Sequence, residues 1–107
     1  MLFTKMHGLG NDFVLFDDTD GSYDDYGDIA KRICDRHFGV GADGILVVKN
    51  SDIADARMLI FNSDGSQAEM CGNGIRCFAK HIYERAGRRK DVLHIETLDG
   101  IKTVEVM

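Results

Sequence analysis

The apolar runs of this chain are short, and their length constrains the fold more than any other feature of the sequence. Gly44 to Val48 is among the longest, and it falls far short of the roughly 20 residues that a bilayer-spanning helix needs. Its apolar part, Ile45 to Val48, is expected to be a buried strand. Other strand-like runs bounded by turn residues are Leu2 to Met6, Phe13 to Phe16, Met58 to Phe61, Leu93 to Thr97 and Ile101 to Val106. We therefore expect strands to outnumber helices.

Two segments instead repeat their apolar residues with the period of a helix. The first is Tyr26 to His37, where Asp24 or Asp25 is a candidate N-terminal cap and Gly39 a candidate left-handed residue after the last turn. The second runs from Asn73 to Ala86. These two segments account for the helical part of the fold.

Several neighbouring strands are expected to form hairpins. The turn-rich segment His7 to Asp12 joins the first two strands, and the dipeptide Asp99-Gly100 joins the last two. We therefore expect an α+β fold, in which a curved, mixed, largely antiparallel sheet wraps around the second helix as a central helix. The 107 residues suit a single domain.

Composition excludes several classes of protein. The formal net charge is −5 and the basic residues form no long run, so a nucleic-acid partner is not expected. The N-terminus lacks the apolar core of a signal peptide. The three cysteines are an odd number and too few for a disulfide scaffold, which indicates a reducing compartment, the cytoplasm. No membrane partner is expected.

The run Met70 to Arg76 carries the strongest chemical signal. Cys71 stands directly before a helical segment, where unpaired backbone amides and the positive end of the helix dipole favour a thiolate. Gly72 and Gly74 expose the backbone around Asn73, so a carboxylate ligand fits against these amides. This combination favours an enzyme that acts on a small anionic substrate.

Other readings of the polar residues stay open at this point. Cys34 lies on the inner face of the first predicted helix and Cys77 inside the second, which indicates core positions for both. The pairs Cys34-x2-His37 and Cys77-x3-His81 have ligand-like spacing, so a non-catalytic zinc-binding module is an alternative. A module that binds an amino acid without chemistry is another.

Polar residues in the glycine-containing turns are interpreted first as turn-forming residues. Taken alone, Asn11 and Asn62 stabilise turns by local hydrogen bonds. Asp12, Asp43 and Asp64 are interpreted in the same way, since they show no spacing typical of paired catalytic carboxylates.

Four segments together resemble, in order and spacing, the signatures of the diaminopimelate epimerase family. They are Lys5 to Phe13, Asp35 to Gly44, Phe61 to Ser66 and Met70 to Cys77, and the resemblance covers essentially the whole chain. It implies the curved α+β half-domain of that family. It also implies epimerisation of LL-diaminopimelate to meso-diaminopimelate, for lysine and peptidoglycan synthesis, without a cofactor.

The resemblance also implies roles for individual residues. In this family two cysteines face opposite sides of the substrate α-carbon, and one removes the proton while the other delivers one. Cys71 matches the first of these. Asn11 and Asn62 match substrate-binding asparagines, and Gly72 and Asn73 match the segment whose amides hold the substrate.

Two departures from the family pattern are visible. Gly44 stands where family members often carry a glutamine, so it is not assigned as a ligand. The family is built of two similar halves, and its second catalytic cysteine lies in the half that this chain does not contain. Residues 1–107 are therefore expected to be a single N-terminal domain that is inactive alone. The face that would meet the absent C-terminal half is expected to be partly apolar, which favours a homodimer or aggregation.

Overall fold

The computed structural model describes residues 3–7, 10–37, 39–69, 71–85 and 92–105. Its elements, in chain order, are β1 (Phe3–His7), β2 (Asp12–Asp17), α1 (Tyr26–Cys34), β3 (Gly44–Lys49), β4 (Ala56–Asn62), β5 (Gln67–Ala68), α2 (Gly72–Arg85), β6 (Val92–Thr97) and β7 (Gly100–Glu105). Every strand and helix expected from the sequence is present in this order. None of the described helices is long and apolar enough to cross a membrane.

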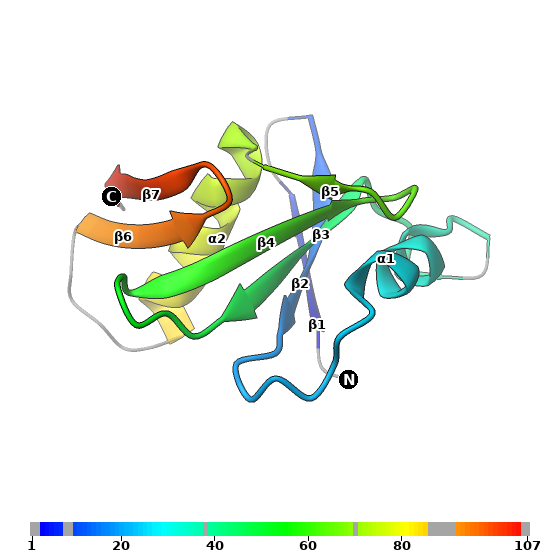
Figure 1. Cartoon of the computed structure of the whole chain (residues 1–107). Coiled ribbons are helices and arrows are strands. Elements are labelled where there is room, and N and C mark those ends of the chain that lie inside the picture. Colours follow the sequence, from blue (N-terminus) through cyan, green and yellow to red (C-terminus); the bar gives the residue numbers. More distant parts are fainter. Residues whose placement is uncertain (1–2, 8–9, 38, 70, 86–91, 106–107) are drawn as a thin grey trace.

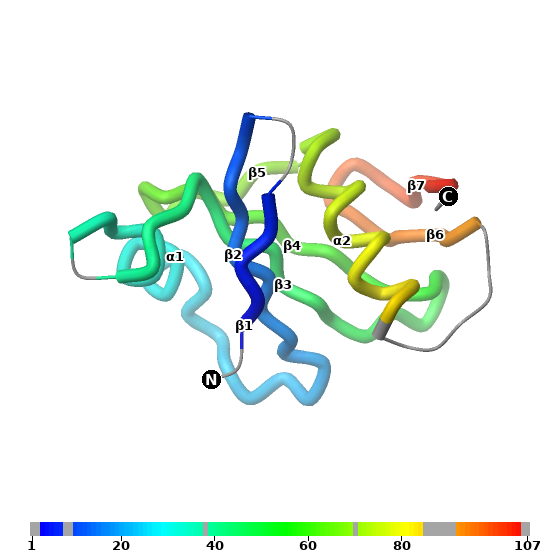
Figure 2. The backbone as a smooth tube through the Cα atoms, turned by 180° about the vertical axis from the view of Figure 1, so that it is seen from behind, coloured from blue at the N-terminus to red at the C-terminus, as the bar shows by residue number. Residues whose placement is uncertain are grey.

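The described strands form one seven-stranded sheet in the order β1-β2-β3-β4-β6-β7, with β5 paired to β4 beside that path. The pairs β1–β2, β3–β4, β4–β5 and β6–β7 are antiparallel, whereas β2–β3 and β4–β6 are parallel. The sheet curves around α2, which contacts β3, β4 and β7 (Figures 1 and 2). The prediction of a mixed, largely antiparallel, curved sheet around a central helix is confirmed.

The two parallel pairs explain why the helices lie on opposite faces of the sheet. α1 connects β2 to β3, and α2 lies on the connection between β4 and β6. Crossovers between parallel strands are almost always right-handed. Because β4 and β6 run opposite to β2 and β3, two right-handed crossovers in the same lateral direction place their helices on opposite faces.

Each face of the sheet has its own core, because successive strand side chains point to opposite sides. The core under α2 includes Phe13, Leu15, Leu46, Val48, Met58 and Ile60 with Ile75 and Phe78 of the helix. The core under α1 includes Val14, Phe16, Ile45, Val47 and Leu59 with Ala30 and Cys34 of the helix. Burial on both faces is the reason why the β3 sequence is an unbroken apolar run rather than an alternating one.

The first helix is shorter than predicted, since it ends at Cys34 and not at His37. Asp35 turns to an extended conformation with ψ 123°, and its Oδ1 accepts a hydrogen bond of 2.7 Å from the His37 amide. A short polar side chain that bonds to nearby backbone competes with the next helical hydrogen bond. In this chain the side-chain bond of Asp35 replaces that hydrogen bond, and the helix ends.

The prediction that Gly39 adopts a left-handed conformation is wrong. The positive φ angle belongs to Gly41, at +80°, and Gly39 is not among the glycines with positive φ. A Cβ at Gly39 would instead lie 2.2 Å from the Arg32 carbonyl oxygen and 2.6 Å from that of Ile33. Glycine is needed at position 39 because two backbone segments approach closely there.

The other element boundaries differ by one or two residues from the predictions, and β5 is not predicted by the sequence pattern. Two residues are too few to show the alternation that marks a strand. Asp25 is the residue before α1, but its side chain makes no capping hydrogen bond. Leu2, Ala86 and Val106, where three predicted elements begin or end, lie outside the described residues.

Candidate active site

Cys71 lies at the N-terminus of α2, as the sequence predicts. Its carbonyl oxygen accepts the first helical hydrogen bond, from the Ile75 amide at 2.9 Å, which makes it the N-cap residue. Cys71 is partly buried and packs against the core under α2. A Cβ at Gly74 would lie 3.5 Å from the Cys71 Sγ and 3.2 Å from a Leu46 methyl group. Gly74 therefore lets the helix start pack tightly beside the thiol.

A side-chain hydrogen bond joins this helix start to the β1–β2 connection. Asn73 Nδ2 donates to Asn11 Oδ1 at 3.1 Å, across 62 residues of sequence. Both side chains are half-buried. The structure thus brings three of the predicted site residues, Cys71, Asn73 and Asn11, to one place.

The pairing register of the sheet places Asn62 at the same end of the strands as the start of β2, which follows Asn11. Phe13 of β2 pairs with Gly44 of β3, and Gly44 pairs with Asn62 of β4. With strands spaced about 4.8 Å apart, Asn62 and Phe13 are roughly 10 Å apart. Gly44 lies between them, and a Cβ there would be 2.8 Å from the Phe61 carbonyl oxygen. The structure therefore leaves no room for a side chain at position 44.

Hydrogen bonds of Asp43 connect the two polar segments on either side of it. Asp43 Oδ2 accepts from the Asp12 amide at 2.7 Å, and the Asp43 amide donates to the Asp12 carbonyl at 2.9 Å. The Asp43 carbonyl accepts from the Ser63 amide at 3.2 Å. Asp12 follows Asn11 and Ser63 follows Asn62, so each bonded residue is next to a predicted substrate-binding asparagine.

Asn62 opens a tight turn that packs against α1. Its amide donates to the Ser66 carbonyl at 2.8 Å, and its Nδ2 donates to Ser66 Oγ at 3.0 Å. Gly65 in the turn has φ +90°, and a Cβ there would lie 2.7 Å from the Lys31 side chain and 3.0 Å from the Gly27 carbonyl. The turn is therefore held against the helix by backbone contact.

His7 and Asp12 form an exposed pair next to this network, with Nδ1 and Oδ1 2.5 Å apart. The hydrogen bond from His7 holds the pKa of the Asp12 carboxyl below its ordinary value, and the positive charges of His7, Lys5 and Arg36 act in the same direction.

Cys34 and Cys77 differ from Cys71 in their surroundings. Both are buried, and burial raises the pKa of each thiol; the nearby carboxylate of Asp43 adds to the effect at Cys34. Cys34 lies in the core under α1 and Cys77 in the core under α2, so the sheet separates them. The four side chains of the zinc alternative, Cys34, His37, Cys77 and His81, therefore do not converge. Among the described residues, no group of three or more His, Cys, Asp or Glu is arranged to hold a metal ion.

Two pockets flank the start of α2. One of about 560 Å³ lies between β1 and α2 and is lined in part by His7, Asn73 and Arg76. Another of about 470 Å³ lies between the helix and β7 and is lined in part by Gly72 and Lys102. The predicted residues Gly72 and Asn73 thus each face a concave surface.

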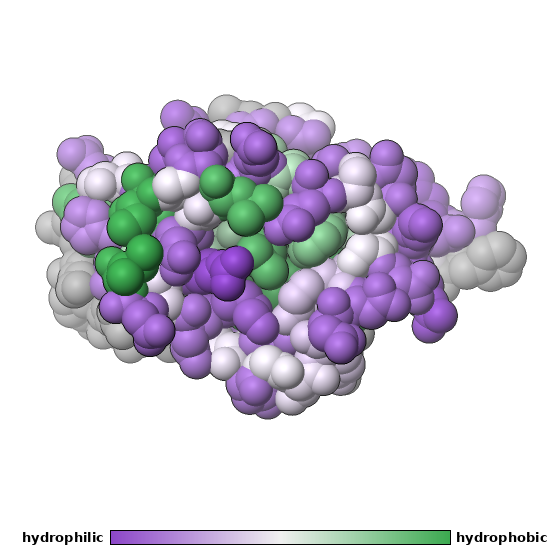
Figure 3. All heavy atoms as spheres, viewed as in Figure 1, coloured by the Kyte–Doolittle hydropathy of each residue, from purple (hydrophilic) through white to green (hydrophobic). Residues whose placement is uncertain are grey.

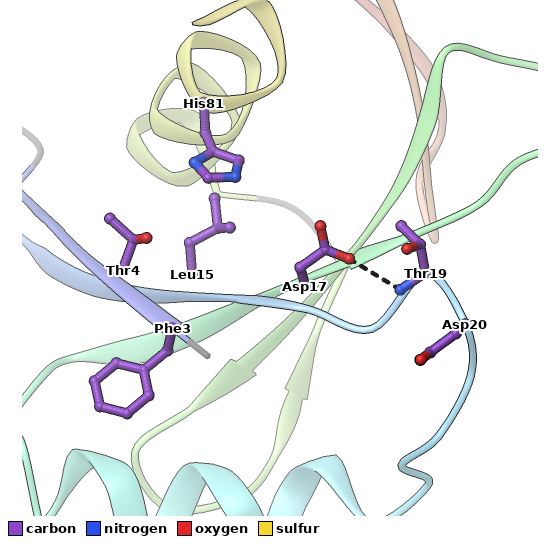
Figure 4. A pocket seen from close by; sticks show the side chains of 7 residues that line it. All are labelled: Phe3, Thr4, Leu15, Asp17, Thr19, Asp20 and His81. Carbon is purple, nitrogen blue, oxygen red and sulfur yellow. Dashed lines mark hydrogen bonds between the residues drawn. The ribbon is translucent and has the colours of Figure 1, made fainter. Parts of the chain in front are cut away.

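A third pocket, of about 580 Å³, contains none of the predicted site residues. It lies where β2 ends, between β1, the following loop and α2, and Figure 4 shows Asp17, Thr19 and His81 around it. Asp17 Oδ1 accepts from the Thr19 amide at 3.0 Å, so this carboxylate is engaged in a local turn. The pocket is therefore not assigned to the active site.

The sequence pattern singles out the candidate site residues but not the residues whose hydrogen bonds connect them. Asp12, Asp43 and Ser63 were interpreted as local turn formers, or not singled out, because the partners of their hydrogen bonds are distant in sequence. Their positions directly before or after buried strands are the only local signal of their role.

Comparisons with known proteins identify the family of this chain. The sequence model of the diaminopimelate epimerase family matches residues 3–107. The chain is 58% identical over 101 residues to diaminopimelate epimerase of Caldanaerobacter subterraneus subsp. tengcongensis, which covers 94% of this chain and 36% of that protein. It is 53% identical over 105 residues to diaminopimelate epimerase of Clostridium perfringens, covering 97% of this chain and 39% of that protein.

A solved structure supports the fold. The crystal structure of a PhzF-family phenazine biosynthesis protein of Bacillus anthracis superposes with a TM-score of 0.75 and 26% identity, covering 98% of this chain and 34% of that one. The chain thus spans little more than a third of the length of the curated relatives that it matches. On the family match over nearly all of its residues, this chain belongs to the diaminopimelate epimerase family.

Proposed function

We propose that this chain supplies one half of an active site that epimerises LL-diaminopimelate to meso-diaminopimelate, with Cys71 as one of two acid/base groups. The observation that carries the proposal is the position of Cys71 at the N-cap of α2, beside the hydrogen bond from Asn73 to Asn11. Asn11, Asn62, Gly72 and Asn73 are the proposed substrate-binding residues. No cofactor is part of the proposal.

The chemistry of the reaction explains why a helix start is suited to it. Removing the α-proton of an amino acid transfers negative charge to the adjacent carboxylate. The first backbone amides of a helix have no acceptor inside the helix and point toward such a charge. Loss of one oriented donor to a developing anion typically costs an enzyme roughly 3 kcal/mol of transition-state stabilisation. Gly72, where the surroundings are open, allows a carboxylate to approach the backbone.

Inversion at the α-carbon needs a second acid/base group on the opposite face of the substrate. Cys77 is on the same helix as Cys71 and is buried, and Cys34 lies across the sheet. Neither is suited to this role. We propose that residues 1–107 act as one N-terminal domain and that a second half-domain provides the partner group, in line with the greater length of the relatives.

Activity of the isolated chain tests the two-half arrangement. The purified 107-residue protein is incubated with LL-diaminopimelate in deuterium oxide, and the product is analysed by NMR and chiral chromatography. We expect neither meso-diaminopimelate nor deuterium at the α-carbon. Either product, formed by wild type but not by Cys71→Ser, would contradict the need for a second half.

Alkylation tests the assignment of Cys71. Iodoacetamide is expected to modify Cys71 at least about tenfold faster than Cys34 or Cys77, because burial raises the pKa of both other thiols and limits access to them. Diaminopimelate should slow modification of Cys71 and leave the other two rates unchanged. Peptide mass spectrometry measures each site separately.

A pair of asparagine variants controls this experiment. Asn62→Ala should abolish the protection by diaminopimelate. Asn50→Ala makes the same chemical change at an exposed position beyond the other end of β3 and should leave protection intact. Protection that survives Asn62→Ala, or equal reactivity of all three thiols, would count against the proposed site.

The proposal includes self-association of this chain. Val92, Leu98 and Ile101 of the β6–β7 hairpin are large exposed hydrophobic residues, and Figure 3 shows hydrophobic surface on this side of the molecule. Exposed apolar surface of this kind favours association. Light scattering should report a dimer or larger species at high protein concentration, and a monomer throughout would contradict the proposal.

A further inference from the structure

Asp43 lies next to the start of β3, at the end of the strands where the candidate site residues Asn11 and Asn62 are found. It immediately precedes β3, whose neighbours β2 and β4 lead from and to the turns that carry Asn11 and Asn62. Asp43 is exposed and lies 31 residues from Asp12 in the sequence. Its place between the two asparagine-bearing segments is a result of the strand order alone.

Three polar groups of Asp43 are bonded to those two segments. The carboxylate and the amide bond to the backbone of Asp12, at 2.7 Å and 2.9 Å, and the carbonyl bonds to the amide of Ser63 at 3.2 Å. The regular pairing of β2 with β3 begins at Phe13 and Gly44. The carboxylate of Asp43 therefore supplies a partner for a backbone amide that lies just before the regular ladder.

The ion pair of Asp43 does not account for this position. Arg36 Nη2 is 3.4 Å from Asp43 Oδ1, and the two side chains are 62% and 40% exposed. Exposed ion pairs contribute little to stability, because solvent and salt screen their attraction. The hydrogen bond from the Asp12 amide to Asp43 Oδ2 is shorter, at 2.7 Å. It requires a side chain at position 43 that carries an acceptor.

Consecutive Cα atoms are about 3.8 Å apart, so Asn11 and Asn62 are each one peptide unit from a residue that Asp43 holds. We propose that Asp43 is a positioning residue, which sets the spacing of Asn11 and Asn62 across Gly44 so that both contact one amino-acid ligand. This inference rests on the proposed function for the identity of that ligand. It adds a positioning role for a carboxylate that is not among the residues proposed to bind the substrate.

The test compares variants of the 107-residue protein. Asp43→Ala removes the acceptor, whereas Asp43→Asn keeps an amide oxygen at the same place and loses only the charge. Asp28→Ala is the matched control, because Asp28 is an aspartate of similar exposure that also pairs with an arginine, Arg32, at 3.2 Å. Should Asp43→Ala not fold, Asp43→Ser serves in its place, since its hydroxyl does not extend as far as the carboxylate oxygens.

Two NMR measurements separate positioning from general stability. Amide hydrogen exchange at Asp12 is expected to accelerate about tenfold in Asp43→Ala, the equivalent of one lost hydrogen bond, and the Asn11 and Asn62 side-chain amide resonances should shift. Diaminopimelate titrations should show affinity weakened by about tenfold in Asp43→Ala, near wild type in Asp43→Asn and unchanged in Asp28→Ala.

The outcomes distinguish the inference from the proposed function. Unchanged exchange at Asp12 and unchanged asparagine resonances in Asp43→Ala would overturn the inference whatever the ligand does. Changed exchange with unchanged affinity would also overturn it, because Asp43 would then be structural only. If wild type does not bind diaminopimelate, the proposed substrate fails, while the asparagine resonances still decide whether Asp43 sets their positions.

Discussion

Two aspartates that accept hydrogen bonds from backbone amides lie near opposite ends of β2, and they differ in almost every other respect. Asp18, just after β2, is 1% exposed. It accepts hydrogen bonds from the Tyr26 hydroxyl and from the amides of Ser22 and Tyr23, and Lys49 Nζ lies 3.8 Å away. Beside the other end, immediately before β3, Asp43 bonds to the segments that carry Asn11 and Asn62, and its side chain is 40% exposed.

Burial decides what each carboxylate contributes. Burial alone would disfavour the charge of Asp18, but the hydrogen bonds from Tyr26 and from the two amides outweigh it, so the pKa of Asp18 lies below its ordinary value. A buried charge with all its partners stabilises the loop between β2 and α1 and the fold around it. An exposed carboxylate contributes little stability but still orients its neighbours. Under the positioning role proposed for Asp43, the same residue type thus serves stability at one end of β2 and the geometry of the candidate site at the other.

The largest expected effect is on Asp18. Asp18→Ala removes the buried carboxylate that accepts from the Tyr26 hydroxyl and pairs with Lys49, and leaves these two groups bonded to each other, Lys49 Nζ to the Tyr26 hydroxyl oxygen at 2.9 Å. Removal of one member of such a group should lower the free energy of unfolding by about 3 kcal/mol. Asp24→Ala, an exposed aspartate in the same loop, should change it by less than about 0.5 kcal/mol. Urea unfolding followed by circular dichroism measures both. Equal values for the two variants would remove the basis of the comparison.

The stability from Asp18 should depend on pH in a defined direction. Because its pKa is lower in the folded than in the unfolded protein, ionised Asp18 stabilises the fold above about pH 4 and the effect is lost as pH falls through the folded pKa. The difference in free energy of unfolding between wild type and Asp18→Asn should be constant from pH 5 to pH 8 and shrink at lower pH. A difference that grows on acidification would show that the sign is wrong.

A smaller effect on stability is expected at the site end. Asp43→Ala removes one exposed hydrogen bond and should lower the free energy of unfolding by about 1 kcal/mol or less. The same urea titration compares it with Asp18→Ala. A loss as large as that of Asp18→Ala would mean that both ends of the strand serve stability equally.

The smallest effect concerns the exposed pair of His7 and Asp12. The hydrogen bond from His7 lowers the pKa of Asp12 in the folded protein. In His7→Ala the titration midpoint of the Asp12 carboxyl, followed by carbon NMR, should move up toward the ordinary aspartate value. Thr4→Ala, an exposed change in the same strand, should leave that midpoint in place. A midpoint that stays low in His7→Ala would show that groups other than His7 stabilise the ionised carboxylate of Asp12.

The elements of this fold were largely predictable from the sequence. The helical period of Ile75, Phe78, Ala79 and Ile82 and the strand-sized apolar runs are local patterns, and local patterns determine which segments become helices and strands. The two exceptions, the early end of α1 and the short strand β5, have causes that the spacing of apolar residues does not show. Asp35 ends α1 early through its own side chain, and β5 is too short for any period.

The site was predictable in part for the same reason. Cys71 before a helical segment is a local signal, so its place at the N-cap was foreseeable. The hydrogen bond between Asn73 and Asn11 spans 62 residues, and nothing in either segment indicates it. Their meeting became an expectation only through the resemblance of four motifs to a family.

The sequence by itself determined both helices apart from the end of α1, the strands apart from β5, the family, and the helix start at which the thiol lies. Only the tertiary structure decided that Asp18 is buried, that Asp43 bonds to the segments next to Asn11 and Asn62, and that the sheet separates Cys34 from Cys77. The physical reason is sequence separation. The periodicity of apolar residues and the chemistry of turns depend on residues that are near each other in the chain. Burial and hydrogen-bond partners depend on strand order and crossover direction, which bring distant segments together.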